Sequence, residues 1–318
     1  MIQLDPDIDT QEEVTQVERH HLVSRLRRGS KRGGLRTLWW VIMIAFVLFF
    51  AVPVLWLLLA TTKTENELIY WGSLRIGSFE HFRQAWDRMF RFEGGVLKAW
   101  FGNSLIYSGG GMALALVTAI PAGYGLALTQ FIGRKTLLAI TLIVMLVPST
   151  ALVLPLFLEI NAVHLLDTPW SLILPFGFFP FGTYITYIFF SSTIPKDLLN
   201  AARIDGCSEW QVFRRVALPL AKPVVALVAF FAFVSDWNNF FLPFVMLPDS
   251  AKYSLPVGLQ DLLSATPVFN PTDGGGQLGL FLPELAVAIV VAVVPVLIVF
   301  LFSQRALMTG MLAGATKE

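Results

Sequence analysis

The sequence predicts an all-α, polytopic membrane protein with six transmembrane helices. Its 318 residues are 55% hydrophobic and only 14% charged, whereas a soluble domain carries about 25% charged residues. Several apolar segments reach the roughly 20 residues that a helix needs to cross a bilayer. Such segments must be helical, because lipid offers the backbone no hydrogen-bond partners. The six expected spans are 38–60, 103–128, 136–158, 170–192, 223–247 and 282–304.

The residues before the first span, 1–37, are predicted to form a cytoplasmic tail that is partly disordered. Residues 1–18 are acidic and polar, a composition that buries too little apolar surface to fold alone. Residues 25–36 are basic and are expected to lie against anionic lipid headgroups. The first span starts too late and runs too long for a cleaved signal peptide. We therefore interpret 38–318 as one six-helix membrane domain.

The distribution of Lys and Arg predicts the orientation of the spans. With both termini in the cytoplasm, sixteen of the 23 basic residues fall on the cytoplasmic side. Five of them lie in the loop 193–222. Of the seven on the other face, six lie in the segment 61–102. Because cytoplasmic loops carry an excess of Lys and Arg, the N- and C-termini are both expected in the cytoplasm.

The polar loop 193–222 carries the signals of two short helices joined by a glycine turn. Pro195 fits the first turn of a helix, and Gly206 suits the left-handed residue that ends one. The segment Ser208–Gln211 has the capping-box pattern S-x-x-Q, and Pro219 is expected to stop the second helix. An ordered helix-turn-helix in a cytoplasmic loop indicates a docking surface. A folded connector without a partner is the plainer alternative.

The same loop resembles the E-A-A-x3-G-x9-I-x-L-P motif of ABC-importer permease subunits. The chain has Asn200-Ala201-Ala202, then Gly206 after three residues, then Val216-Ala217-Leu218-Pro219 after nine more. The stretch Ala-Ala-Arg-Ile-Asp-Gly at 201–206 is similar to the carbohydrate, or maltose-type, branch. The resemblance extends over about 38–318 through shorter matches at Asn103-Ser104, Ile194-Pro195-Lys196, Leu255-Pro256-Val257-Gly258-Leu259 and Ala313-Gly314-Ala315.

This resemblance implies a permease subunit of an ATP-driven sugar importer in a bacterial or archaeal cytoplasmic membrane. It implies a second permease subunit as heterodimer partner, two cytoplasmic ATPase subunits that hold ATP and Mg, and an extracellular substrate-binding protein. No cofactor is expected on this chain. The loop 193–222 would dock on an ATPase subunit and couple its closure to alternating access of the spans. The implied coupling residues are Asn200, Ala201, Ala202, Asp205, Gly206, Leu218 and Pro219.

Two positions depart from the family pattern. Asn200 stands where Glu is usual, and Val216 stands where Ile is usual. The second change is mild, whereas the first removes a charge that could pair with a basic ATPase residue, a contact worth about 1.5–3 kcal/mol when buried. Asn200 can still form hydrogen bonds, and Asp205 offers a carboxylate nearby. We therefore place more weight on Ala202, Asp205 and Gly206 than on Asn200.

Four polar or aromatic residues of the fifth span are candidates for the substrate pathway. A charged group within a membrane usually faces a cavity, and Asp236 lies near the middle of this span. The amides of Asn238 and Asn239 suit sugar hydroxyls, and the ring of Trp237 suits the apolar face of a sugar. The family has its carboxylate at the position of Asn239, so roles do not transfer directly. The alternative is that these groups join neighbouring helices.

Other functional classes are disfavoured by what the sequence lacks. No G-x-x-x-x-G-K-[ST] phosphate-binding loop occurs, so we expect no enzyme activity and ATP hydrolysis on a partner. Histidine and cysteine show no metal-ligand spacing, and a net charge of +1 does not suggest nucleic acid. An ion-gradient secondary transporter would predict internal repeats, which we do not find. A non-transport membrane scaffold is the other alternative, and the sequence does not identify the sugar.

Overall fold

The structure is a computed structural model that describes residues 36, 38–70, 72, 74–266 and 281–313 of the chain. The predicted N-terminal tail, apart from Arg36, and Gly314-Ala315 of the C-terminal match lie outside the described residues. The chain separates into two units, Met1–Leu59 and Ala60–Glu318, and each is described by itself.

In the first unit, the described residues form the helix Leu38–Ala60, which ends at the first residue of the second unit. Its 23 residues have a mean hydropathy of 2.9. The segment matches the expected first span.

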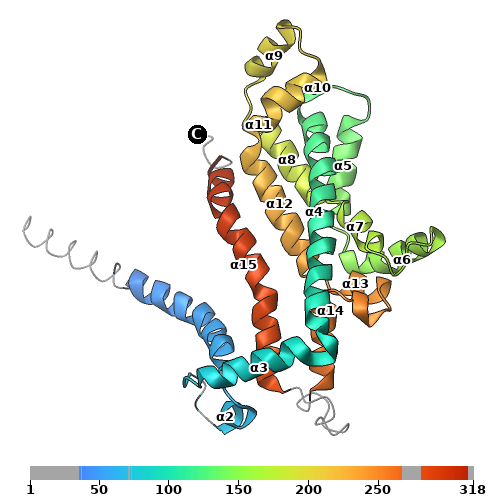
Figure 1. Ribbon diagram of the computed structural model, residues 1–318. Helices are drawn as coiled ribbons and strands as arrows, with labels where there is room; N and C mark the ends of the chain where they lie inside the picture. Colours follow the sequence, from blue (N-terminus) through green and yellow to red (C-terminus); the bar gives the residue numbers. More distant parts are fainter. Residues whose placement is uncertain (1–35, 37, 71, 73, 267–280, 314–318) are drawn as a thin grey trace, which may run out of the picture. The chain divides into compact units, whose positions relative to one another are not determined.

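The second unit is helical over most of its described length (Figure 1). Its α-helices are α2 (Glu65–Tyr70), α3 (Phe79–Arg91), α4 (Val96–Leu128), α5 (Arg134–Val144), α6 (Val153–Ala162), α7 (Trp170–Phe176), α8 (Pro180–Ser192), α9 (Lys196–Ile204), α10 (Glu209–Val212), α11 (Leu218–Leu220), α12 (Lys222–Trp237), α13 (Phe241–Met246), α14 (Leu255–Ala265) and α15 (Leu282–Ala313). Short 3-10 turns lie at Phe92–Gly94, Ser149–Leu152 and Ser250–Lys252, and a π-helical turn lies at Phe213–Ala217.

Within the described residues, four helical segments are long and apolar enough to cross a membrane, and up to six spans result if each of two bent pairs counts as one. Besides the first helix, the continuous segments are Val96–Leu128, Trp170–Ser192 and Leu282–Arg305, with mean hydropathies of 1.7, 1.5 and 3.3. This agreement confirms the predicted all-α membrane fold. The segment Val96–Leu128 begins seven residues before the expected 103, directly after Gly95, whose φ is +91°.

The expected third span, 136–158, is not one straight helix. Its two helical parts, Arg134–Val144 and Ser149–Ala162, meet at an angle of 102°. Pro148 lies in the break. Proline lacks a backbone N–H and disfavours a helical conformation in the residue before it. The prediction of a continuous span was therefore wrong here, because the apolar run hides the proline break.

The expected fifth span, 223–247, is also interrupted. The helix α12 ends at Trp237, and α13 starts at Phe241. Two side chains bond backbone groups at the break: Asn238 Nδ2 donates to the Val234 carbonyl at 2.8 Å, and Asn239 Oδ1 accepts from the Leu242 N–H at 3.2 Å. Such bonds help to satisfy backbone groups where a helix breaks at membrane depth, and the Val234 carbonyl also accepts from the Asn238 N–H at 3.2 Å.

Helix α4 is the centre of the second unit and packs against α7, α8 and α12. Figure 1 shows α4, α8 and α12 running beside one another. Glycines on α4 allow the close approach, because a Cβ atom at Gly123 would lie 2.5 Å from Thr186 Cβ, and one at Gly111 would lie 2.6 Å from Phe176 Cβ. Small residues at helix contacts are a general device of membrane bundles.

At the end of the unit opposite α9 and α10, α3 packs across α4 and α15 (Figure 1). It starts directly after Ser78, whose Oγ accepts from the His81 N–H at 3.1 Å and caps the helix. Its last turn carries Arg88, which pairs with the buried Glu284 of α15 at 3.1 Å. The pair holds α3 against the start of α15.

Candidate functional site

The loop 193–222 folds as two helices around a glycine turn, as expected. Helix α9 starts at Lys196, one residue after Pro195. At its end Gly206 has φ of +84°, and the Cys207 N–H donates to the Ala202 carbonyl at 3.0 Å. This arrangement is a Schellman cap. No heavy atom lies within 4 Å of the position that a Cβ atom would take at Gly206, so the backbone conformation alone requires glycine.

The second helix begins with the capping box that the sequence predicted. Ser208 Oγ accepts from the Gln211 N–H at 3.4 Å, and Gln211 Oε1 accepts from the Ser208 N–H at 2.8 Å. As expected, this helical segment ends near Pro219, at Leu220. The chain passes through a π-helical turn into α11, with Pro219 in its first turn, and then bends by 78° into α12. Proline is tolerated there because the first turn needs no N–H donor.

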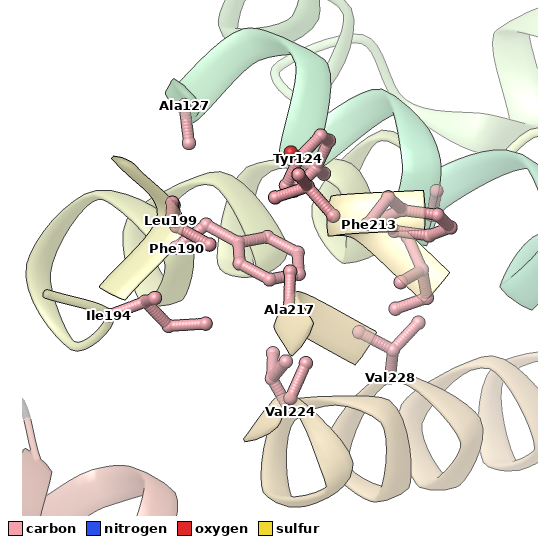
Figure 2. Close-up of a cluster of buried hydrophobic side chains, with 13 residues drawn as sticks. Tyr124, Ala127, Phe190, Ile194, Leu199, Phe213, Ala217, Val224 and Val228 are labelled. Atoms are coloured by element: carbon pink, nitrogen blue, oxygen red, sulfur yellow. The ribbon is translucent and has the colours of Figure 1, made fainter. Parts of the chain in front are cut away.

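A buried apolar cluster, here called the inner cluster, anchors the loop to the spans (Figure 2). Leu199 of α9 is 1% exposed and belongs to it. The ring of Tyr124, from α4, packs against Phe190 of α8 at 5.4 Å and Phe213 of the π-helical turn at 5.0 Å. The cluster consists of Ala119, Ile120, Tyr124, Ala127, Phe190, Ile194, Leu199, Val212, Phe213, Ala217, Ala221, Val224 and Val228.

A polar network spans the glycine turn. Arg203 Nε and Nη2 donate to the two carboxylate oxygens of Glu209 at 2.7 and 3.2 Å. Arg203 Nη1 donates to Asn200 Oδ1 at 2.9 Å, and the Tyr124 hydroxyl donates to Glu209 Oε2 at 3.3 Å. The hydrogen bond between Arg203 and Glu209 is the main cause that raises the pKa of Arg203 and lowers the pKa of Glu209. The contacts of this network were not predicted from the sequence.

The expected coupling residues differ in exposure. Asn200, Ala201, Asp205 and Gly206 lie exposed on α9 and its turn, whereas Ala202 packs against the inner cluster. The last two expected coupling residues lie on α11. Leu218 also packs on the inner cluster, whereas Pro219 is exposed. Two further apolar side chains of the loop face outward and were not selected from the sequence: Ile204 and Trp210 are 86% and 63% exposed.

A cleft of about 770 Å³ lies beside α12 and is bordered by α5, α6, α7, α8 and α13. Asp236 and Asn239 line it, together with Ser235, Glu159 and several phenylalanines. Asp236 is 8% exposed, and its Oδ2 atom accepts no hydrogen bond within the described part of the chain. A Cβ atom at Gly111 would lie 2.6 Å from this oxygen, so glycine makes room for the carboxyl group against α4.

The other two predicted pathway residues do not line this cleft. Trp237 is 3% exposed, its ring stacks on Phe233 at 5.5 Å, and its Nε1 donates to the Ala292 carbonyl of α15 at 3.0 Å. Asn238 bonds its own helix. Over the described residues, no group of three or more His, Cys, Asp or Glu side chains has the geometry to hold a metal ion.

One family match covers both the loop 193–222 and the residues beside the cleft. Residues 111–312 match the family described as "Binding-protein-dependent transport system inner membrane component". The chain belongs to this family. The match includes the loop 193–222 and the break after Trp237. It confirms the family resemblance drawn from the motif.

Individual members of the family are similar over most of their length. The arabinooligosaccharides transport system permease protein AraQ of Bacillus subtilis is 33% identical over 290 residues, which cover 87% of this chain and 96% of AraQ. The diacetylchitobiose uptake system permease protein NgcG of Streptomyces coelicolor is 33% identical over 281 residues, covering 85% and 83%.

A solved structure supports the fold. One chain of a bacterial ABC transporter involved in the import of the acidic polysaccharide alginate superposes with a TM-score of 0.71 at 24% sequence identity. The superposition covers 83% of the present chain and 93% of that chain. The two chains therefore share a fold over most of their length.

Proposed function

We propose that this chain is a permease subunit of an ATP-driven importer of oligosaccharides. The observation that carries the proposal is the exposed glycine turn of α9, which lies inside the family match and keeps the spacing of the permease motif. AraQ and NgcG, both similar over more than four fifths of this chain, are named as permeases of oligosaccharide systems. A sugar made of a few units is therefore the substrate class we infer.

In this proposal the loop 193–222 and both termini lie in the cytoplasm, in line with the distribution of Lys and Arg. Helix α9 and its turn seat in a cleft of an ATPase subunit. The exposed side chains of Ile204 and Trp210 supply the apolar contacts, because large apolar groups at an interface core contribute most of its binding energy. The partner ATPase subunits bind ATP and Mg, and this chain binds no cofactor.

The translocation pathway includes the cleft beside α12 and is completed by a second, different permease subunit. An extracellular binding protein delivers the sugar. Asp236 and Asn239 are the groups that we assign to the pathway, because both line the cleft and a buried carboxyl group without a partner is costly unless a ligand or water satisfies it. The face of α12 that carries Trp237 serves packing instead.

Reconstituted uptake tests the class of transporter. The chain is inserted into liposomes with its ATPase, second permease and binding protein, and uptake of labelled arabino- and chito-oligosaccharides is measured. We expect accumulation only with ATP and only with an ATPase that hydrolyses it. Accumulation by this chain alone, driven by an ion gradient, would overturn the proposal. A complex that assembles but moves no solute would instead favour a scaffold.

Two matched substitutions test the pathway assignment. Asp236→Asn replaces a group that lines the cleft, whereas Asn238→Ala alters a neighbour that does not line it. We expect the first to change the half-saturating sugar concentration or the transport rate and the second to leave both unchanged. If both variants transport like the native protein, these polar groups serve helix packing.

A further inference from the structure

Helix α9 contacts the inner cluster through one buried side chain, Leu199, and one half-buried side chain, Ala202. The remaining α9 residues with described exposure are exposed, apart from the half-buried Arg203. Apolar contacts are non-directional, so these two resist separation but orient the helix less sharply than a hydrogen-bonded contact does. A helix that transmits movement from a docked partner needs a second, oriented attachment.

The guanidinium group of Arg203 supplies an oriented attachment. It forms a two-pronged contact with Glu209, at 2.7 and 3.2 Å, across the Gly206 turn. Paired bonds between a guanidinium and a carboxylate fix relative orientation as well as distance. On its other side Arg203 is held by Asn200 Oδ1 at 2.9 Å. The contact therefore links the outer face of α9 to the first residue of α10.

The same carboxylate continues the link into the membrane domain. Glu209 Oε2 also accepts from the hydroxyl of Tyr124 at 3.3 Å. Tyr124 is 6% exposed, and its ring is held between Phe190 and Phe213 in the inner cluster. Its helix, α4, packs against α7, α8 and α12. The path from Asn200 through Arg203 and Glu209 thus ends in the central span of the unit.

We propose that Glu209 is a positioning residue that transmits the movement of α9 to α4, through Arg203 on one side and Tyr124 on the other. This inference rests on the proposed docking of α9 on an ATPase subunit. Without Glu209, movement of α9 would reach α4 through the apolar contacts of Leu199 and Ala202 and through the longer covalent path by α10, α11 and α12.

The link also explains how the chain accommodates Asn200. The neutral amide of Asn200 accepts one hydrogen bond from Arg203, and the guanidinium forms its ion pair with Glu209. A carboxylate at position 200 would place a second negative group beside Arg203 and compete for it. We therefore expect Asn200→Glu to weaken the contact between Arg203 and Glu209, and with it the path from α9 to Tyr124. We expect this although Glu is the usual residue of the family motif.

The test measures sugar transported per ATP hydrolysed in the complete, reconstituted transporter. Glu209→Gln removes the charge and keeps the size, Tyr124→Phe removes only the hydroxyl, and Asp87→Asn neutralises an exposed carboxylate of α3, at the opposite end of the unit. A charge-assisted bond between partly exposed groups corresponds to about a fivefold change in an equilibrium. We expect about a fivefold lower ratio for Glu209→Gln and Tyr124→Phe, and no change for Asp87→Asn.

The double variant Glu209→Gln/Tyr124→Phe separates transmission from general destabilisation. If both residues act in one path, the double variant loses no more coupling than the more severe single variant, whereas independent effects add. Additive losses would overturn the proposal. Loss of ATPase co-purification in Glu209→Gln would overturn it as well, because Glu209 would then be a docking residue. Failure of the proposed function would instead appear as absent ATP-dependent uptake by the native complex.

Discussion

The glycine turn after α9 offers a sharp test, because Gly206→Val perturbs the backbone alone. Gly206 has φ of +84°, and the space around its missing Cβ is empty to 4 Å. No collision therefore adds to the conformational cost, which is about 1–2 kcal/mol for a residue with a side chain in the left-handed region. A β-branched residue lies at the upper end of that range.

That cost translates into a defined loss of coupling. The cap that depends on this conformation consists of the Gly206 N–H bond to Arg203 at 3.1 Å and the Cys207 N–H bond to Ala202 at 3.0 Å. A penalty of about 1–2 kcal/mol shifts the population of the capped turn by roughly 5–30-fold. If docking needs the capped turn, sugar uptake by Gly206→Val falls by about that factor while ATP hydrolysis by the partner persists.

The assay records ATP-dependent uptake, ATP hydrolysis and the amount of protein inserted in the membrane. Gly133→Val is the matched control, since Gly133 has φ of +91° and equally empty surroundings but lies before α5, outside the loop 193–222. We expect insertion to be preserved in both variants and coupling to be lost only in Gly206→Val. Native coupling in that variant, or equal losses in the two, would refute the reasoning.

Three further perturbations follow from the packing and the charges. Leu199→Ala should lower the free energy of unfolding in detergent by about 2–5 kcal/mol, and a loss below 1 kcal/mol would contradict its role as the buried anchor. Gly258→Ala should cost about 1–3 kcal/mol, because its Cβ would lie 2.1 Å from the ring of Trp100, whereas Gly102→Ala meets nothing within 4 Å and should be tolerated. The pKa of Glu209 is lowered from 4.5 by its guanidinium partner, so its charge contributes stability above pH 4.5 that is lost as the pH falls through the lowered pKa. In thermal unfolding scans, the difference in unfolding temperature between the native protein and Glu209→Gln should therefore shrink as the pH falls. A difference that grows on acidification would contradict the ion pair between Glu209 and Arg203 as its cause.

The features that sequence reasoning predicted well are those with local signals. Ser208 caps a helix through an atom three residues away, and Gly206 is recognised by the conformation that only glycine adopts readily. Long apolar runs located the four continuous spans, and the motif spacing identified the family. In each case the physical cause lies within a few residues of the signal.

The features that it missed depend on the rotation or direction of whole helices. Periodicity does not show that Trp237 faces α15 while Asp236 faces the cleft. Tyr124 and Glu209 are 85 residues apart and meet only because α10 folds back against α4. The ion pair of that network could have been predicted, because a basic residue at 203 and an acidic residue at 209 flank the glycine turn. Pro148 likewise marked the bend in the third span.

The unequal hydropathy of the spans bears on how the protein is made. The helix Leu38–Ala60 and the last span, Leu282–Arg305, have mean hydropathies of 2.9 and 3.3, so each can enter the bilayer as soon as it is synthesised. The spans Val96–Leu128 and Trp170–Ser192 reach only 1.7 and 1.5, and their glycines and hydroxyls are sheltered by neighbouring helices. These two spans therefore gain less from the bilayer itself and rely more on packing against other helices of the second unit.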